Sequence, residues 1–277
     1  MRPPSAKLGI VAGGGGLPGR LIAACRECRR DVFVIALEGI TDRDGLDGAA
    51  HAWVHLGALE RMIGLLREAA VEEVVLAGPV PRPSLRTLRL DKRALKRLVG
   101  LRPGALGDDR LLSLIVDELE GEDFRVVGVD TILTDLLAPE GAVGALEPDA
   151  DARVDIAAGV RVARALGALD VGQAVVVQHG VVLGVEAIEG TDALLARCRD
   201  LRRDGPGGVL VKLKKPGQER RADLPTIGPD TVANARAAGL SGIAVEAGNA
   251  LIVDRAKVAE AADAGGLFVV GIVPEEG

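Results

Sequence analysis

Residues 7–21 read KLGIVAGGGGLPGRL, and this stretch decides how the first half of the chain folds. The apolar run Leu8–Ala12 has the length and composition of a buried parallel strand. Four glycines, Gly13–Gly16, follow it, and Pro18 then stands where the first turn of a helix tolerates proline. A strand, a glycine turn and a helix in this order predict the first unit of an α/β domain. The loop can bring backbone N–H groups close to a phosphate, with Leu17 opening the helix.

The same stretch leaves the ligand open. Gly14, Gly16 and Gly19 satisfy the G-x-G-x-x-G spacing of dinucleotide-binding domains. Glu38 falls roughly where such domains carry an acid for the ribose. The pattern G-x-x-x-x-G-K-[ST] does not occur, which excludes a Walker A loop. An NAD(P)-dependent oxidoreductase, a protein that binds another nucleotide, and a plain strand-to-helix turn all remain alternatives.

Apolar runs alternate with stretches of helical spacing through the first half of the chain. We predict further strands at Val32–Leu37, Ala52–Leu56, Glu73–Ala77 and Arg125–Val129, and helices at Leu17–Arg30, Leu59–Ala70, Leu85–Val99 and Asp109–Glu120. This alternation predicts an α/β fold with a Rossmann-like, mainly parallel sheet. Pro, Gly and Ala replace the periodic pattern around residues 137–153, so we place the first domain at 1–136 and the second at 137–277.

The second half predicts a mixed α/β domain that is partly antiparallel. The dipeptide His179-Gly180 separates two apolar runs and indicates a hairpin. We expect helices at Ala150–Leu166, Asp192–Arg203 and Thr231–Ala238, a strand at Val209–Leu213, and a strand, hairpin, strand, helix and strand over 242–272.

Composition narrows the class of protein. Of 277 residues 48% are hydrophobic, but there are only three Phe, one Trp and no Tyr. Single-stranded nucleic acid binds on aromatic platforms, and the net charge of −6 attracts no polyanion, so we expect no nucleic-acid partner. We find no apolar run long enough to span a membrane, no signal peptide, and only three cysteines, and we therefore expect a cytoplasmic protein.

The stretch VKLKKPGQERRADLPTIGPD, residues 211–230, is the most unusual part of the chain. Lys212 and Lys214 alternate along one strand face, and Lys215 follows them. Asp223 stands directly before Leu-Pro-Thr-Ile-Gly, which includes the hydroxyl of Thr226. Cations beside a carboxylate and a hydroxyl suit phosphate chemistry, because the cations hold oxygens while the carboxylate binds Mg²⁺ or orients water. An exposed charged loop is the alternative.

Two further acidic stretches precede helical patterns. Asp108 and Asp109 stand before an apolar helical repeat, where one could cap the helix while the other holds a cation. Glu186 lies near a strand end and could be an interior acid. The nearby Thr191 and Asp192 are predicted to cap the next helix.

A basic stretch covers residues 82–102 and carries eight Lys or Arg against one Asp. Leucines recur through it at helical spacing, so we expect a basic amphipathic segment. It is either a solvated helix face packed on the sheet or a peripheral contact with an anionic membrane surface.

Several of these motifs together resemble the UDP-2,3-diacylglucosamine pyrophosphatase family LpxI of lipid A biosynthesis. They are GIVAGGGGLPGRL (9–21), GDDRLLSLIVDELE (107–120), GVEAIEGTDALLARC (184–198), KKPGQERRADLPTIG (214–228), GLSGIAVEAGNALIVDR (239–255) and GLFVVGI (266–272). The resemblance spans nearly the whole chain. The length and charge of the 82–102 segment depart from the family pattern.

The resemblance implies a nucleotide-binding first domain and a family-specific catalytic and lipid-binding second domain. It implies Mg²⁺-dependent hydrolysis of UDP-2,3-diacylglucosamine, with water attacking the α-phosphorus to give UMP and 2,3-diacylglucosamine 1-phosphate. Asp223 matches the family's essential aspartate and would bind the metal.

The remaining site residues divide into two groups. Lys212, Lys214 and Thr226 would act beside Asp223 in catalysis. The substrate would be bound by the loop Gly13, Gly14, Gly15 and Gly16 with Leu17, by Asp108 and Asp109, and by Lys215 and Glu186. We also expect a homodimer. An NAD(P)-dependent oxidoreductase and a non-catalytic nucleotide-binding regulator remain the competing hypotheses.

Overall fold

A computed structural model describes residues 6–46, 48–80, 90–99 and 108–274. The chain divides into two compact units. The first comprises Met1–Thr134 together with Glu219–Asp223, and the second comprises Asp135–Gln218 together with Leu224–Gly277.

The first unit is built on a five-stranded sheet in which every pair of neighbours is parallel. Its order is β3-β2-β1-β4-β5. The strands are β1 (Leu8–Ala12), β2 (Val32–Leu37), β3 (His51–Val54), β4 (Glu73–Ala77) and β5 (Arg125–Val126), and the helices are α1 (Leu17–Glu27), α2 (Leu59–Glu68), α3 (Lys92–Val99) and α4 (Asp108–Glu120). The predicted Rossmann-like parallel sheet is confirmed. Strands β2 and β3 lie on one side of β1, and β4 and β5 lie on the other side. The strand order therefore reverses between β1 and β4.

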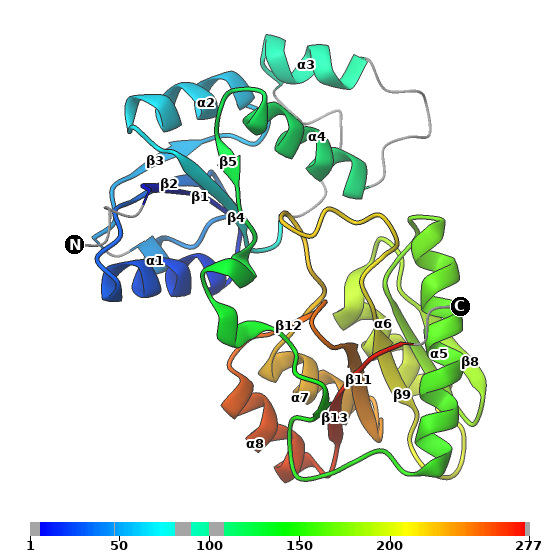
Figure 1. Cartoon of the computed structure of the whole chain (residues 1–277). Helices are drawn as coiled ribbons and strands as arrows, with labels where there is room; N and C mark the ends of the chain where they lie inside the picture. Colours follow the sequence, from blue (N-terminus) through cyan, green and yellow to red (C-terminus); the bar gives the residue numbers. More distant parts are fainter. Residues whose placement is uncertain (1–5, 47, 81–89, 100–107, 275–277) are drawn as a thin grey trace. The chain divides into compact units, whose positions relative to one another are not determined.

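Helices cover both faces of this sheet. On one face α2 and α4 pack Ile63, Leu66 and Leu119 against β-branched residues of the strands. On the other face α1 contributes the buried side chains of Leu21 and Cys25, and Figure 1 shows α1 and α2 on opposite sides of the strands. Burial raises the pKa of the Cys25 thiol, so this cysteine behaves as a small core residue.

The second unit holds a six-stranded mixed sheet of order β6-β13-β11-β9-β7-β8. Its strands are β6 (Gly141–Ala142), β7 (Ala174–Gln178), β8 (Val181–Val185), β9 (Val209–Lys212), β11 (Gly242–Glu246) and β13 (Phe268–Ile272), and a separate parallel pair joins β10 (Thr226–Ile227) to β12 (Leu251–Ile252). Strands β9, β11 and β13 run parallel, while β6, β7 and β8 pair antiparallel. The predicted mixed α/β domain is therefore confirmed.

Helices also lie on both faces of the second sheet. The long α5 (Ala150–Ala168) covers one face with Ile156 and Ala163. The other face is covered by α6 (Gly190–Cys198), α7 (Pro229–Ala237) and α8 (Arg255–Gly265). Figure 1 shows α5 on the opposite side of the strands from α7 and α8. Short 3-10 turns are η1 (Arg43–Leu46), η2 (Val129–Thr131), η3 (Thr134–Leu136) and η4 (Arg199–Leu201).

The hairpin predicted at His179-Gly180 is present between β7 and β8. His179 and Gly180 have φ angles of 51° and 73°, the two positive values that a tight turn of this kind requires. The carboxylate of Asp155, which is 3% exposed, accepts their two amides at 3.0 and 2.6 Å. A buried acid on α5 thus fixes the turn.

The second hairpin, predicted within 242–272, is wrong. Strand β11 pairs with β9 and β13, whereas β12 pairs with β10 in the other sheet. The Ala-Gly-Asn-Ala turn that suggested a hairpin instead redirects the chain. The Ala247 amide donates to the Ile272 carbonyl and the Gly248 amide to the Ala138 carbonyl, and Gly248 has a φ of 67°. These bonds hold the turn against neighbouring segments, and β12 leaves towards the smaller sheet.

Several element boundaries also differ from the predictions. Strand β3 is His51–Val54 rather than Ala52–Leu56, and β5 ends at Val126 because η2 begins at Val129. Helix α6 is Gly190–Cys198, with η4 after it. Of the helix predicted at 85–99, the structure describes α3, Lys92–Val99, and residues 81–89 lie outside the described part of the chain.

Candidate functional site

The glycine loop after β1 is bonded to the loop after β4, at the point where the strand order reverses. The Gly13 amide donates to the Ala77 carbonyl at 2.7 Å, and the Gly14 amide donates to the Pro79 carbonyl at 2.9 Å. A Cβ on Gly13 would lie only 2.4 Å from the Gly78 carbonyl oxygen. The first two glycines therefore serve the packing of two backbone segments, and their amides are already occupied.

The third glycine amide contacts an acid that the sequence analysis did not single out. The Gly15 amide donates to Asp42 Oδ2 at 3.0 Å. The preceding Thr41 is buried; it accepts from the Leu37 amide at 2.8 Å and donates to the Ala12 carbonyl at 2.5 Å. This pair of bonds fastens the loop after β2 to the end of β1 and brings Asp42 to the glycine turn.

This geometry changes what the loop can bind. A carboxylate at Gly15 repels a phosphate but accepts hydrogen bonds from hydroxyl groups. The amides of Gly16 and Leu17 precede the first intrahelical bond of α1, Arg20 to Gly16, and can meet an anion at the helix N-terminus. Glu38, expected from its position to be the ribose acid, is exposed and its amide donates to Val54. A Thr-Asp pair a few residues after the second strand was the available signal for Asp42.

In the second unit, Lys212, Thr191 and Glu186 form a buried chain of hydrogen bonds. Lys212, at the end of β9 and 7% exposed, donates from Nζ to Thr191 Oγ1 at 2.9 Å. Thr191 Oγ1 in turn donates to Glu186 Oε1 at 2.6 Å. Glu186 is 6% exposed, and its other oxygen accepts the Gln173 amide at 3.1 Å. One hydroxyl thus links an ammonium group to a carboxylate inside the second unit.

Thr226 lies in contact with the same lysine. Lys212 Nζ donates to the Thr226 carbonyl at 3.1 Å, and the Thr226 hydroxyl donates to the Leu224 carbonyl at 3.0 Å. The structure therefore brings together Lys212, Thr226 and Glu186 of the residues predicted from the sequence, and adds Thr191.

The capping roles predicted for Thr191 and Asp192 are wrong. Helix α6 begins at Gly190, and its N-cap, Glu189, makes no side-chain cap hydrogen bond. Thr191 is one residue inside the helix and uses its hydroxyl on Glu186 and Lys212, while Asp192 accepts a bond from Asn234 at 2.9 Å. Hydrogen bonds from the backbone, and after them the Arg197 side chain, lower the pKa of Glu189.

The other two lysines do not continue the strand face that the sequence suggested. Strand β9 ends at Lys212, so Lys214 lies beyond it, with its amide donating to Glu246 at 3.1 Å. Lys215 is 8% exposed and pairs with Asp170 at 2.7 Å. Lys215 therefore neutralises an acid of its own unit.

Asp223 belongs to the first unit, although Leu224, the next residue, belongs to the second. It is half-buried, and its amide donates to the Glu219 carbonyl at 3.0 Å. Asp108 and Asp109 are the first described residues of helix α4, and residues 100–107 before them lie outside the described part of the chain, so their capping role stays a prediction. The basic segment 82–102 lies largely outside the described residues.

The donor set for a metal is sparse in the described part of the chain. Among residues 6–46, 48–80, 90–99 and 108–274, no three His, Cys, Asp or Glu side chains gather in a way that could hold a metal ion. Mg²⁺ commonly takes one or two protein carboxylates together with substrate phosphates and water. A single carboxylate such as Asp223 fits Mg²⁺ that is bound jointly with a diphosphate.

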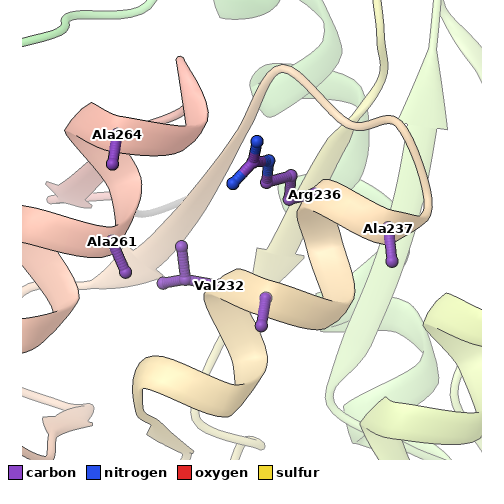
Figure 2. A pocket seen from close by; sticks show the side chains of 6 residues that line it. Val232, Arg236, Ala237, Ala261 and Ala264 are labelled. Carbon is purple, nitrogen blue, oxygen red and sulfur yellow. The ribbon is translucent and has the colours of Figure 1, made fainter.

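A shallow groove runs between α7 and α8 of the second unit (Figure 2). Its volume is about 500 Å³, and its lining is Val232, Ala233, Arg236, Ala237, Ala261 and Ala264. Most of the lining side chains are alanines, and the Arg236 guanidinium lies at one side of the groove. The groove offers an apolar surface with one cation and no acid or nucleophile.

In the part of the chain that the structure describes, no helix is both long and apolar enough to span a membrane.

The fold and the site define a two-unit α/β protein whose first unit is Rossmann-like. That unit has a parallel sheet with a glycine loop where its strand order reverses, and the second carries a buried Lys-Thr-Glu cluster beside a mixed sheet. Comparison with known families is consistent with this division. The LpxI N-terminal domain matches residues 7–136, and the LpxI C-terminal domain matches residues 139–270.

The chain belongs to the LpxI family. It is 43% identical over 277 residues to the UDP-2,3-diacylglucosamine pyrophosphatase LpxI of Caulobacter vibrioides, covering 98% of this chain and 99% of that protein. Among solved structures, the biotin carboxylase domain of Hydrogenobacter thermophilus 2-oxoglutarate carboxylase is 13% identical with a TM-score of 0.26. That match covers 71% of this chain and 40% of the other, and a likeness of this size carries no argument.

Proposed function

We propose that this chain hydrolyses the diphosphate bond of UDP-2,3-diacylglucosamine in lipid A biosynthesis. The observation that carries the proposal is the near full-length identity of 43% to a protein named as the pyrophosphatase for that substrate. Membership of both LpxI domain families supports it over the whole chain.

In the proposed reaction, water attacks the α-phosphorus. A bond forms between the water oxygen and that phosphorus, and the bond from the phosphorus to the bridging oxygen breaks. The products are UMP, which keeps the water oxygen, and 2,3-diacylglucosamine 1-phosphate, and the two protons of the water pass to the product phosphates or to solvent. Such a displacement needs charge neutralised on the non-bridging oxygens and a positioned nucleophile.

The lysines of the second unit are suited to neutralising charge on the non-bridging phosphate oxygens. Lys212 offers an ammonium group whose direction is set by Thr191 and the Thr226 carbonyl, at 2.9 and 3.1 Å. We assign to Lys212 and Lys214 the binding of phosphate oxygens. Lys215 is not assigned that role, because its ammonium group is paired with Asp170.

We assign the positioning of the attacking water to Asp223, directly or through a metal ion. It would hold Mg²⁺ together with the substrate phosphates, or orient the attacking water. When bound, Mg²⁺ supplies charge neutralisation at the phosphate oxygens. Asp223 is half-buried at the end of a short turn, where its backbone amide donates to the Glu219 carbonyl.

We assign the uridine side of the substrate to the glycine loop of the first unit. The geometry supports two different contacts there: hydroxyl groups of a ribose on Asp42, and an anion at the amides of Gly16 and Leu17. Asp42 replaces Glu38 as the proposed ribose acid. A homodimer and a peripheral contact with an anionic membrane remain part of the proposal.

Release of UMP from UDP-2,3-diacylglucosamine with Mg²⁺ is the decisive assay. Asp223→Ala should abolish turnover while substrate binding survives, so the loss falls on kcat rather than on the affinity. Asp204→Ala, which removes an exposed loop aspartate of the second unit, is the matched control and should keep the wild-type rate. In H₂¹⁸O the label should appear in UMP.

The competing functions give different results in the same experiments. Near-normal turnover by Asp223→Ala would reject its assignment, and label in the sugar phosphate would reject attack at the α-phosphorus. Nucleotide binding without any UMP release would indicate a non-catalytic regulator. Fluorescence titration with NADH tests the oxidoreductase hypothesis, and saturable binding would favour it.

A further inference from the structure

The segment Glu219–Asp223 is placed in the first unit by its own contacts. The residues on either side of it, Gln218 and Leu224, belong to the second unit. These five residues therefore belong to the first unit, although the chain on both sides of them belongs to the second. Asp223, the residue proposed to act on the diphosphate, is the last of the five.

The segment packs against the first unit's apolar core. Ala222 packs against the cluster formed by α2, α4 and strands β1, β2 and β4. The backbone of the neighbouring Arg221 lies close to the loop after β5, because a Cβ on Gly128 would be 3.6 Å from Arg221 Cα. The segment thus contacts the first unit through its backbone as well as its side chains.

Two arginines fasten the segment to acids of the first unit. Arg220 Nη2 pairs with Asp130 Oδ2 at 2.8 Å, and the Asp130 side chain is only 11% exposed. Arg221 Nη1 pairs with Glu120 Oε1 at 2.5 Å, at the end of α4. The partners are 90 and 101 residues away along the chain, so these bonds exist only in the folded unit.

Within the segment a second set of bonds connects the arginines to Asp223. The Arg221 guanidinium binds both carboxylate oxygens of Glu219, at 2.9 and 2.9 Å. The Glu219 carbonyl accepts the amides of Ala222 and Asp223, each at 3.0 Å. The turn that carries Asp223 is therefore closed on Glu219, whose side chain is held by Arg221.

We propose that Arg220 and Arg221 are positioning residues that fix Asp223 to the first unit through Asp130 and Glu120. The inference rests on the function proposed above. In this arrangement the position of the Asp223 carboxylate is fixed by the first unit, to which we assign nucleotide binding. In the sequence, Asp223 lies between two parts of the second unit. The arginines need not touch the substrate.

Charge reversal across the Arg220–Asp130 pair tests this directly. Arg220→Glu and Asp130→Arg should each lower kcat by about 10–100-fold with little change in KM, because a displacement near 1 Å of a reacting group has an effect of this size. The double variant, Arg220→Glu with Asp130→Arg, restores an ion pair and should recover kcat to within about threefold of wild type. The same swap is not applied to Arg221 and Glu120, because the Arg221 guanidinium also binds both carboxylate oxygens of Glu219.

Arg67→Glu is the matched control. Arg67 pairs with Glu122 in the same unit and takes no part in the Arg220–Asp130 and Arg221–Glu120 pairs, so its reversal should leave kcat unchanged. Each variant is first checked by circular dichroism. Where a charge reversal does not fold, Gly128→Ala takes its place: its Cβ would lie 2.3 Å from Asp130 Oδ1 and push that carboxylate off Arg220, which should also lower kcat.

The outcomes separate this inference from the proposed function. If the wild-type chain releases no UMP, the proposed function fails. If the wild type is active and the folded variants of Arg220 and Asp130 keep its kcat, the positioning role is overturned. A loss of kcat that the double variant does not recover also overturns it, because the effect then does not depend on the ion pair.

Discussion

Removing the Thr191 hydroxyl is the sharpest test of the hydrogen-bonded cluster of Lys212, Thr191 and Glu186 in the second unit. Thr191→Val keeps the shape of the side chain and removes two hydrogen bonds, one from Lys212 at 2.9 Å and one to Glu186 at 2.6 Å. Each bond involves a charged partner, and such bonds contribute about 1.5–3 kcal/mol. Both charged groups are less than a tenth exposed, so water replaces the lost partner poorly.

The magnitude follows from these contacts. Some relaxation of the lysine and the carboxylate offsets part of the loss, so we expect the free energy of unfolding to fall by about 2–4 kcal/mol. For a unit of this size that lowers Tm by about 5–15 °C. Lys212 also loses the bond that sets its direction, and we expect kcat for UMP release to fall by about 10–100-fold.

Thermal unfolding and steady-state UMP release on the same preparations measure both effects. Thr191→Ser keeps the hydroxyl and should recover most of kcat and most of the lost stability, which a general packing defect at α6 would not allow. A Thr191→Val protein with wild-type Tm and wild-type kcat would refute the reasoning, since neither bond would then contribute. A lower Tm with unchanged kcat would show that the cluster stabilises the unit without positioning Lys212.

Two predictions concern the first unit. Asp42→Ala should reduce the preference for UMP over 2′-deoxy-UMP, measured as the ratio of their dissociation constants, because the proposed ribose contact is the Asp42 carboxylate; an unchanged ratio would remove Asp42 from that role. The Arg221 guanidinium lowers the pKa of Glu219 below its ordinary value of 4.5. The pair therefore stabilises the protein above pH 4.5, and the contribution is lost as the pH falls through the lowered pKa. Wild type should accordingly lose more stability on acidification from about pH 5 to pH 3 than Arg221→Met does in unfolding titrations, and parallel losses would contradict the assignment.

The strands and helices of the first unit could be predicted because each is a local pattern. Leu8–Ala12 and Glu73–Ala77 are continuous apolar runs, and both are strands with those bounds. The hydrogen-bond partners of the glycine amides could not be predicted in the same way. The occupation of the Gly13 and Gly14 amides depends on the loop after β4, more than sixty residues away in the chain.

The second unit shows where local signals mislead. Thr191 and Asp192 have the residue types of a helix cap, yet the position of β9 beside α6 gives the Thr191 hydroxyl a lysine and a buried carboxylate to bind. Along the sequence Lys215 cannot be distinguished from Lys212 and Lys214, but in the structure it pairs with Asp170. In each case a partner distant in sequence decides the role, and spacing along one segment carries no information about that partner.

The return of five residues to the first unit also decides how this protein can be divided. Expressed alone, residues 1–134 would lack the alanine that packs against their core and would leave Asp130 and Glu120 without their arginines. A fragment from residue 135 onward would carry the segment Glu219–Asp223 without Asp130, without Glu120 and without the core against which Ala222 packs. During synthesis the first unit acquires its last piece only after most of the second has been made. A single cut between residues 134 and 135 thus separates the polypeptide into two fragments but does not produce two complete domains.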